Sequence, residues 1–198
     1  MAHLQPLERS VIRDDELQSM LERYLLIRKF IPNSVLTMAR RPAIAKAFAA
    51  LNQAILYEGT VPEETKMLIA LISSQASGCR YCQSHMANLS SLYGASDEKI
   101  AQLWEFETSE LFTDAERAAL RVAWKAGQLP NSSDVTDFDA LKSHWDEGQI
   151  VEIVATIGLF GYLNRWNDTL STELEDHPAG VAQRTLSGWG WEPGKHHQ

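Results

Sequence analysis

The sequence has few of the features that mark specialised classes of protein. Only two of its 198 residues are cysteine, too few for a disulfide scaffold. Its longest uncharged and strongly apolar stretch, residues 153–163, is well short of the roughly 18 residues that a membrane helix needs. Basic residues are also scarce, because 18 Lys and Arg face 26 Asp and Glu, for a formal net charge of -8. We therefore expect a small molecule or a protein as partner, and neither nucleic acid nor a membrane.

The N-terminus lacks the basic patch and apolar run that mark a secretory signal. This favours a cytoplasmic protein, and thiols in the cytoplasm are normally kept reduced. Two cysteines in that compartment are more often reactive, metal-binding or incidental than a structural disulfide. Their positions in the sequence decide among these roles.

Helix signals recur along the whole chain, and no stretch alternates apolar and polar residues between hairpin turns, so we predict an all-α fold. Thr60 is expected to cap a helix that runs through the apolar block 67–72, because Pro62 and Glu63 follow it. Thr113 predicts a second capped helix, which ends at Gly127. Apolar residues at helical spacing predict a long core helix that continues towards residue 166, and they are Ile150, Ile153, Val154 and Ile157.

Further helices are predicted at residues 14–29, 42–57, 79–93, 97–104 and 137–145. No repeat or flexible linker divides the chain, so we predict a single helical domain. Its parts would be N-terminal helices (1–58), a core (59–105), C-terminal helices (106–175) and an irregular tail (176–198). The two tryptophans of this tail, Trp189 and Trp191, are expected to anchor it to a surface, which could belong to a neighbouring subunit.

The most informative segment is residues 77–85, where Cys79 and Cys82 form a Cys-x-x-Cys motif directly after a helix-breaking Ser-Gly pair. The motif therefore falls at the start of a helix. Residues three apart in a first helical turn can be close enough for a disulfide, and the free amides and dipole of a helix N-terminus favour thiolate. Arg80 adds positive charge nearby. We predict a dithiol more reactive than free cysteine.

His85 lies about one helical turn after Cys82. At roughly 100° per residue, it stands about 60° from Cys82 and about 120° from Cys79 around the helix axis, so it flanks Cys82. An imidazole there can accept the thiol proton near neutral pH, or return one to a leaving group. The alternative is a histidine with a structural role only, which is the commoner case for a lone histidine.

Other uses of the cysteines have less support. A structural zinc site needs a fourth ligand besides Cys79, Cys82 and His85, and only the distant His144 or His177 could supply it. Covalent haem requires a histidine directly after the second cysteine, where this chain has glutamine. A thioredoxin-like motif would follow a strand, and no strand is predicted. We expect no metal and no cofactor.

The segment from residue 64 to residue 85 resembles the core of the carboxymuconolactone decarboxylase superfamily, on its alkylhydroperoxidase D-like, peroxidase-related side. The likeness consists of an apolar helix, a Gly-Cys break, the Cys-x-x-Cys motif and a nearby histidine. It is strongest over about residues 60–105 and extends through residues 164–168. It implies a helical bundle that presents the dithiol at a helix N-terminus, commonly as a homo-oligomer, and a peroxidase cycle without haem or metal. The decarboxylase branch lacks the cysteine pair, which argues against lactone chemistry.

The resemblance also implies roles for individual residues. In the peroxidase members the second cysteine attacks the peroxide, and the first converts the resulting sulfenic acid to a disulfide. Cys82 would then be the peroxidatic cysteine, Cys79 the exposed resolving cysteine, and His85 a part of the proton relay. An external dithiol would reduce the disulfide again.

Two positions depart from the family pattern. Met86 stands where the family has its histidine, one residue after His85, and Met67 stands where it has the relay glutamate. Asn164 and Asp168 share a face of the predicted long helix and would suit a polar site, although a buried network or a subunit contact explains them as well. The candidates to replace the missing acid are Glu64, Ser73, Ser74 and Asp168.

The sequence thus predicts an antioxidant, peroxidase-type oxidoreductase, or a disulfide oxidoreductase, that reduces peroxides through Cys79 and Cys82. Its expected partners are a peroxide, an external dithiol reductant and further copies of the same chain. Two alternatives stay open. One is a redox-sensing oligomer without turnover, and the other is a carboxymuconolactone decarboxylase-like enzyme in which the cysteines are incidental.

Overall fold

The computed structural model describes residues 2–197, and every regular element among them is helical. This confirms the predicted all-α class. None of these helices is both long enough and apolar enough to cross a membrane. The helices are α1 (Asp15–Arg28), α2 (Asn33–Met38), α3 (Pro42–Leu56), α4 (Glu63–Ala76), α5 (Arg80–Leu92), α6 (Asp97–Ala101), α7 (Asp114–Ala126), α8 (Val135–Lys142), α9 (Glu147–Leu170) and α10 (Asp176–Leu186), with short 3₁₀ turns at Arg9–Val11, Leu103–Glu105, Ser187–Trp189 and Gly194–His196.

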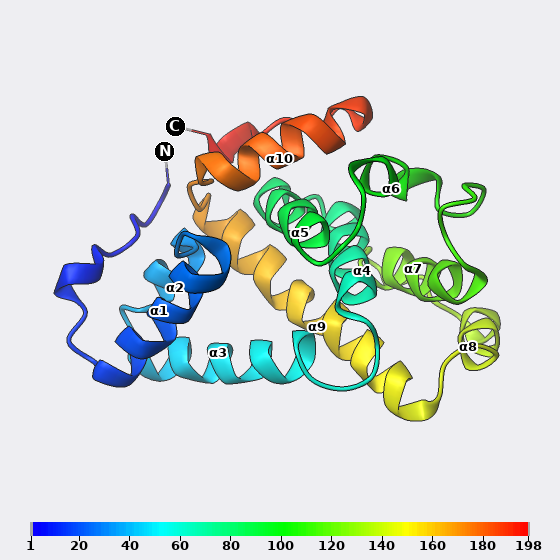
Figure 1. Ribbon diagram of the computed structural model, residues 1–198, viewed down its shortest axis with the longest axis horizontal. Helices are drawn as coiled ribbons and strands as arrows, with labels where there is room; N and C mark the ends of the chain where they lie inside the picture. The colour runs from blue at the N-terminus through cyan, green and yellow to red at the C-terminus, as the bar shows by residue number, and fades with distance from the viewer. Residues whose placement is uncertain (1, 198) are drawn as a thin grey trace.

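The centre of the fold is the pair α4 and α5, around which the other helices pack. α9 crosses behind this pair, α7 lies along α4, and α10 lies along α5 (Figure 1). Residues 65–74 of α4 and 81–90 of α5 are all buried, so both helices are enclosed on every side. A helix with such burial belongs to the interior of a protein. The Cys-x-x-Cys motif lies at the start of α5, three residues after the end of α4.

Local capping signals explain where several helices begin. Thr113 and Glu116 form the predicted capping box at the start of α7, and Gly127 follows the end of that helix, as expected.

The prediction that Thr60 caps α4 is wrong, because the helix begins at Glu63 and its N-cap residue is Pro62. The Thr60 N–H donates to Glu152 of α9 at 2.9 Å. Glu152 also pairs at 2.8 Å with the fully buried Lys66, which fixes α4 against α9.

The prediction of an irregular tail over residues 176–198 is wrong for its first half, which forms α10. Apolar residues of α10, among them Val181, Ala182 and Leu186, are buried, and the helix packs along α5. Both tail tryptophans are anchored on this chain's own surface. The Trp189 indole donates to the Ala101 carbonyl at 2.6 Å, and the Trp191 indole donates to the Arg80 carbonyl at 3.4 Å. The C-terminal segment therefore covers the start of α5.

Candidate dithiol site

The two cysteines lie at the N-terminus of α5, as the motif predicted. Gly78, with φ of +78°, breaks the chain after α4, and Cys79 is the N-cap residue of α5. The Cys79 N–H donates to the Ser74 carbonyl at 3.1 Å, which holds the turn. The two thiols are free in the structure, and both residues are buried. The expectation that Cys79 is exposed is therefore wrong, because the C-terminal segment packs over this end of α5.

The two thiols differ in acidity. A hydrogen bond from the Cys82 thiol and, to a smaller extent, the nearby His196 together lower the pKa of Cys79 to about 6, against the effect of burial. Burial and the neighbouring Cys79 sulfur raise the pKa of Cys82 well above its usual value, although the Asn167 amide acts in the opposite direction. The pair thus loses its first proton easily and holds the second tightly. At neutral pH this leaves one thiolate at Cys79 and one thiol at Cys82.

Cys82 faces a small cavity, and Cys79 does not. The cavity has a volume of about 40 Å³ and its lining includes Cys82, His85 and Met86, with Phe48 and Phe160 among its apolar walls. The Asn167 side chain comes from α9 and donates from Nδ2 to the Cys82 sulfur at 3.4 Å. The sulfur that a small molecule in this cavity would meet is therefore that of Cys82.

His85 lies on the Cys82 side of the helix, as predicted, and an acid from the far end of the chain holds its ring. His85 Nε2 donates to Glu175 Oε2 at 2.7 Å, and the Tyr81 hydroxyl donates to Glu175 Oε1 at 3.0 Å. The Asn33 N–H donates to the same carboxylate. The rings of Tyr81 and His85 stack with their centroids 4.3 Å apart. No hydrogen bond joins His85 to Cys82 among residues 2–197, although both line the small cavity.

The Glu175 carboxylate is ionised in this setting. Burial alone would raise the pKa of its carboxyl group, but the charge and hydrogen bond of His85, together with the Asn33 N–H, bring that pKa below the usual value. A carboxylate hydrogen-bonded to an imidazole fixes the orientation of the ring and stabilises its protonated form. The structure therefore combines a dithiol with a carboxylate–imidazole pair beside one cavity.

None of the residues proposed from the sequence replaces the missing acid. Glu64 pairs with Lys99 at 2.8 Å, and Asp168 pairs with Lys195 at 2.8 Å. The Ser74 hydroxyl bonds within its own helix, and the buried Ser73 hydroxyl has no hydrogen-bond partner in residues 2–197. Asn164 is buried, and its side-chain amide finds no hydrogen-bond partner in the described part of the chain. The acid that reaches His85 is Glu175, 90 residues away in sequence.

Sequence reasoning also missed Tyr81, Asn167 and His196. Tyr81 lies between the two cysteines and could have been noticed there as a polar neighbour of the motif. Asn167 is three residues after Asn164 on α9, and no spacing rule distinguished it from its neighbour. His196 reaches the dithiol only because the C-terminal segment folds back, where its Nδ1 donates to the Thr172 carbonyl at 2.8 Å. In residues 2–197, no three His, Cys, Asp or Glu side chains are grouped so as to hold a metal ion.

Comparison with known proteins connects this arrangement to one family. Residues 42–125 match the model of the carboxymuconolactone decarboxylase family. The crystal structure of the debrominase Bmp8 is 34% identical in sequence and has a TM-score of 0.85, over 92% of this chain and 97% of that one. A cysteine-to-alanine variant of Bmp8, in complex with 2,3,4-tribromopyrrole, has a TM-score of 0.86 at the same identity, over 92% of this chain and 96% of that one.

Two more distant proteins are also similar. A peroxidase-related protein from Ralstonia eutropha JMP134, described as an alkylhydroperoxidase AhpD core, is 23% identical, with a TM-score of 0.80 over 89% of this chain and 94% of that one. It shares the fold. YdfG, an uncharacterized protein of Bacillus subtilis strain 168, is 26% identical over 112 residues, which are 56% of this chain and 74% of that protein.

Proposed function

The chain belongs to the carboxymuconolactone decarboxylase superfamily, on its alkylhydroperoxidase D-like side, and from this premise we propose that it is a dithiol-dependent peroxidase. It reduces a hydroperoxide with the two electrons of Cys79 and Cys82. The observation that carries the proposal is a pair of thiols with different pKa values at the start of α5, of which Cys82 shares a cavity with His85. Tuned thiols beside a positioned imidazole are typical of thiol-based catalysis.

Cys82 is the attacking residue in this proposal, because its sulfur lines the cavity. The Cys79 thiolate accepts the Cys82 proton when substrate arrives, so that the negative charge moves to the sulfur that faces the substrate. The Asn167 N–H, 3.4 Å from that sulfur, stabilises the charge there. Cys79 is thus first a base and later the resolving thiol.

The reaction balances with two thiols and one hydroperoxide. Attack by the Cys82 sulfur breaks the O–O bond, forms a sulfenic acid and releases the remaining oxygen, which takes a proton and leaves as an alcohol. His85, held by Glu175, supplies that proton. The Cys79 sulfur then displaces the hydroxyl group of the sulfenic acid as water, and a Cys79–Cys82 disulfide forms. An external dithiol reduces this disulfide and is itself oxidised.

Steady-state turnover of cumene hydroperoxide with dithiothreitol tests the proposal. The unaltered chain should consume hydroperoxide, whereas Cys82→Ser should not. Cys79→Ser is the matched comparison and is assayed without dithiothreitol. It should consume at most one equivalent of hydroperoxide, more slowly than the unaltered chain because the base is lost, and leave Cys82 as a sulfenic acid. A redox sensor without turnover would form the disulfide but would recycle no faster than free dithiothreitol reacts. Full turnover by Cys82→Ser would refute the proposal.

Reductive debromination is a second candidate, and the 34% identity to a debrominase over most of the chain favours it. This reaction replaces C–Br by C–H, releases bromide and a proton, and oxidises the same two thiols to the disulfide. Phe48 and Phe160 give the small cavity aromatic walls, which would favour contact with an aromatic ring that approaches Cys82. Bromide release from a brominated pyrrole, measured beside hydroperoxide loss on one preparation, distinguishes the two reactions by their kcat/KM values.

A further inference from the structure

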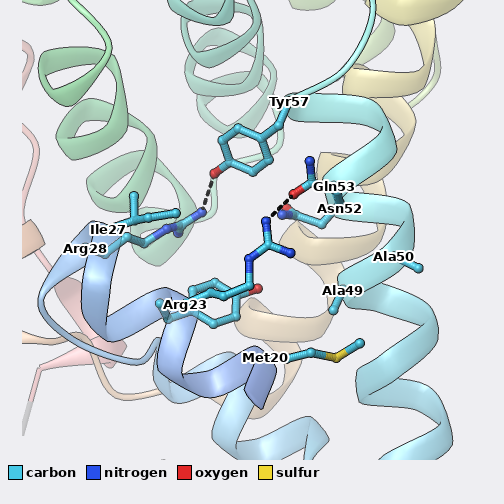
Figure 2. Close-up of a pocket in the computed structure, with 10 residues that line it drawn as sticks. Met20, Arg23, Ile27, Arg28, Ala49, Ala50, Asn52, Gln53 and Tyr57 are labelled. Carbon is cyan, nitrogen blue, oxygen red and sulfur yellow. Dashed lines mark hydrogen bonds between the residues drawn. The ribbon is translucent and has the colours of Figure 1, made fainter. Parts of the chain in front are cut away.

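A larger cavity lies between α1 and α3, beside the small cavity that contains Cys82. Its volume of about 330 Å³ is at the lower end of the range for small-molecule sites. Figure 2 shows its walls, to which Met20 and Ile27 of α1 and Ala49 and Ala50 of α3 contribute aliphatic surface. Ile27 and Ala50 are exposed, so the cavity opens at the protein surface. Its size and lining suit an organic molecule.

The charged residues of this cavity are arginines. Arg23 and Arg28 line it, whereas no Asp or Glu lines either this cavity or the small one. This is notable in a chain with a net charge of -8. Within residues 2–197, neither arginine forms an ion pair with a carboxylate. The cavity therefore attracts anions.

The Arg28 guanidinium has further N–H donors with which to bind such an anion. It is half-buried, it donates one hydrogen bond, to the Tyr57 hydroxyl at 2.9 Å, and its guanidinium lies 5.2 Å from the centre of the Tyr24 ring. Arg23 donates to the Gln53 side chain at 3.2 Å (Figure 2). Both partners are uncharged. A guanidinium carries five N–H donors in a fork that matches a carboxylate.

The two cavities meet at Arg28. Tyr24, Arg28 and Asn52 line both of them, so these three side chains are all that the linings place between the larger cavity and the one that contains Cys82. Beyond this junction the walls are mainly apolar, with Phe48 and Leu163 among them. The two adjacent cavities thus place a cationic, surface-facing end next to an apolar end with a reactive thiol.

We propose that the larger cavity binds the carboxylate of an organic acid, which Arg28 holds while the apolar body of the molecule extends to Cys82. The substrate class is then an amphipathic organic acid with its reactive group, a hydroperoxide, at the end opposite the carboxylate. The identity of that reactive group rests on the proposed function. The anion site rests only on the geometry of the cavity.

A matched pair of substrates tests the inference kinetically. Cumene hydroperoxide and its para-carboxylated derivative differ only in the charged group. We expect Arg28→Gln to lower the ratio of kcat/KM for the carboxylated compound to kcat/KM for the neutral compound by roughly 10- to 100-fold, the usual effect of a charge-assisted pair. Arg28→Lys should restore part of the preference, because it retains the charge. Arg13→Gln is the control, since Arg13 is exposed and lines neither cavity.

A binding measurement separates the anion site from the reaction. Calorimetric titration of the Cys82→Ser chain with octanoate, beside octanol, needs no turnover. Octanoate should bind at least about 10-fold more tightly than octanol, and Arg28→Gln should abolish this difference. If neither hydroperoxide is consumed but octanoate still binds through Arg28, the proposed function fails and the anion site stands. Equal binding of octanoate and octanol, or an Arg28→Gln chain with unchanged preference, would overturn the site.

Discussion

Replacing Glu175 by glutamine should lower the free energy of unfolding by an amount that can be predicted from the contacts of the carboxylate. The carboxylate accepts hydrogen bonds from His85, Tyr81 and the Asn33 N–H, and its side chain is 14% exposed. Glutamine keeps an oxygen for two of these donors but loses the charged contact with His85. A hydrogen bond to a charged group contributes about 1.5–3 kcal/mol, so the free energy of unfolding should fall by about that amount.

Urea unfolding at pH 7 measures this loss. Glu173→Gln is the matched control, because Glu173 lies two residues earlier in the same segment and its carboxylate has no partner in the described part of the chain. That control should change stability by less than about 0.5 kcal/mol. If both variants lose the same small amount, the reasoning about the His85–Glu175 pair is wrong.

The same substitution should slow the reaction. A positioned acid–base group contributes roughly 10²- to 10⁴-fold to a rate, and Glu175 acts here as a positioning residue for His85. We expect kcat for hydroperoxide to fall at least about 100-fold in Glu175→Gln, with KM changed little and with the pH profile of kcat altered. A kcat close to that of Glu173→Gln would show that His85 does not need Glu175.

Acid pH should remove the stabilising effect of Glu175. Its pKa is lowered in the folded protein, so its contribution is fully present above the pKa of the unfolded chain and is lost as pH falls through the lower, folded value. The stability difference between the unaltered chain and Glu175→Gln should therefore shrink below about pH 4. A difference that grows on acidification would contradict the direction of the shift.

Three further predictions concern the dithiol and the core. A pH titration of the ultraviolet thiolate absorbance of the reduced protein should show a first midpoint near pH 6, because the pKa of Cys79 is lowered to about 6 from 9.0. Cys79→Ser should abolish this midpoint, and a first midpoint near pH 9 in the unaltered chain would contradict the prediction. Asn167→Leu removes the N–H donor from the Cys82 sulfur and should lower kcat about 10-fold, and steady-state kinetics that show no loss would exclude this role. Glu152→Ala leaves the buried Lys66 ammonium without its acid and should lower the free energy of unfolding, measured in urea, by about 3–5 kcal/mol. A decrease of less than about 1 kcal/mol would indicate that water solvates the ammonium group in the variant.

The sequence predicted those features of the site that depend on local signals. The Ser-Gly break and the Cys-x-x-Cys spacing placed the dithiol at a helix start, and the structure has it there. Helical spacing placed His85 on the same side as Cys82, and both residues line one cavity. Such features depend on residues within a turn or two of one another, so one stretch of sequence contains all the information.

The features that the sequence did not predict depend on contacts between distant segments. Glu175 reaches His85 across 90 residues, and nothing in the sequence around it distinguishes it from the neighbouring acids Glu173 and Asp176. The helix α10 was not predicted, although Pro178 and Gly180 are both compatible with it. Proline is tolerated in the first turn of a helix, where Pro178 lies, and packing against α5 compensates for the glycine. Burial of Cys79 depends on the segment after this helix, where Trp191 and His196 lie against the start of α5, and this long-range contact could not be predicted from the motif.

The central claim is that Cys79 and Cys82 together deliver two electrons to a substrate in the adjoining cavity. The most direct test is the intact mass of the reduced protein after one equivalent of cumene hydroperoxide, measured beside the amount of alcohol formed. We predict one alcohol per chain and the loss of two hydrogens, with a disulfide that joins Cys79 to Cys82. Alcohol formation while both thiols stay reduced, or a protein that gains oxygen without forming the disulfide, would contradict the claim.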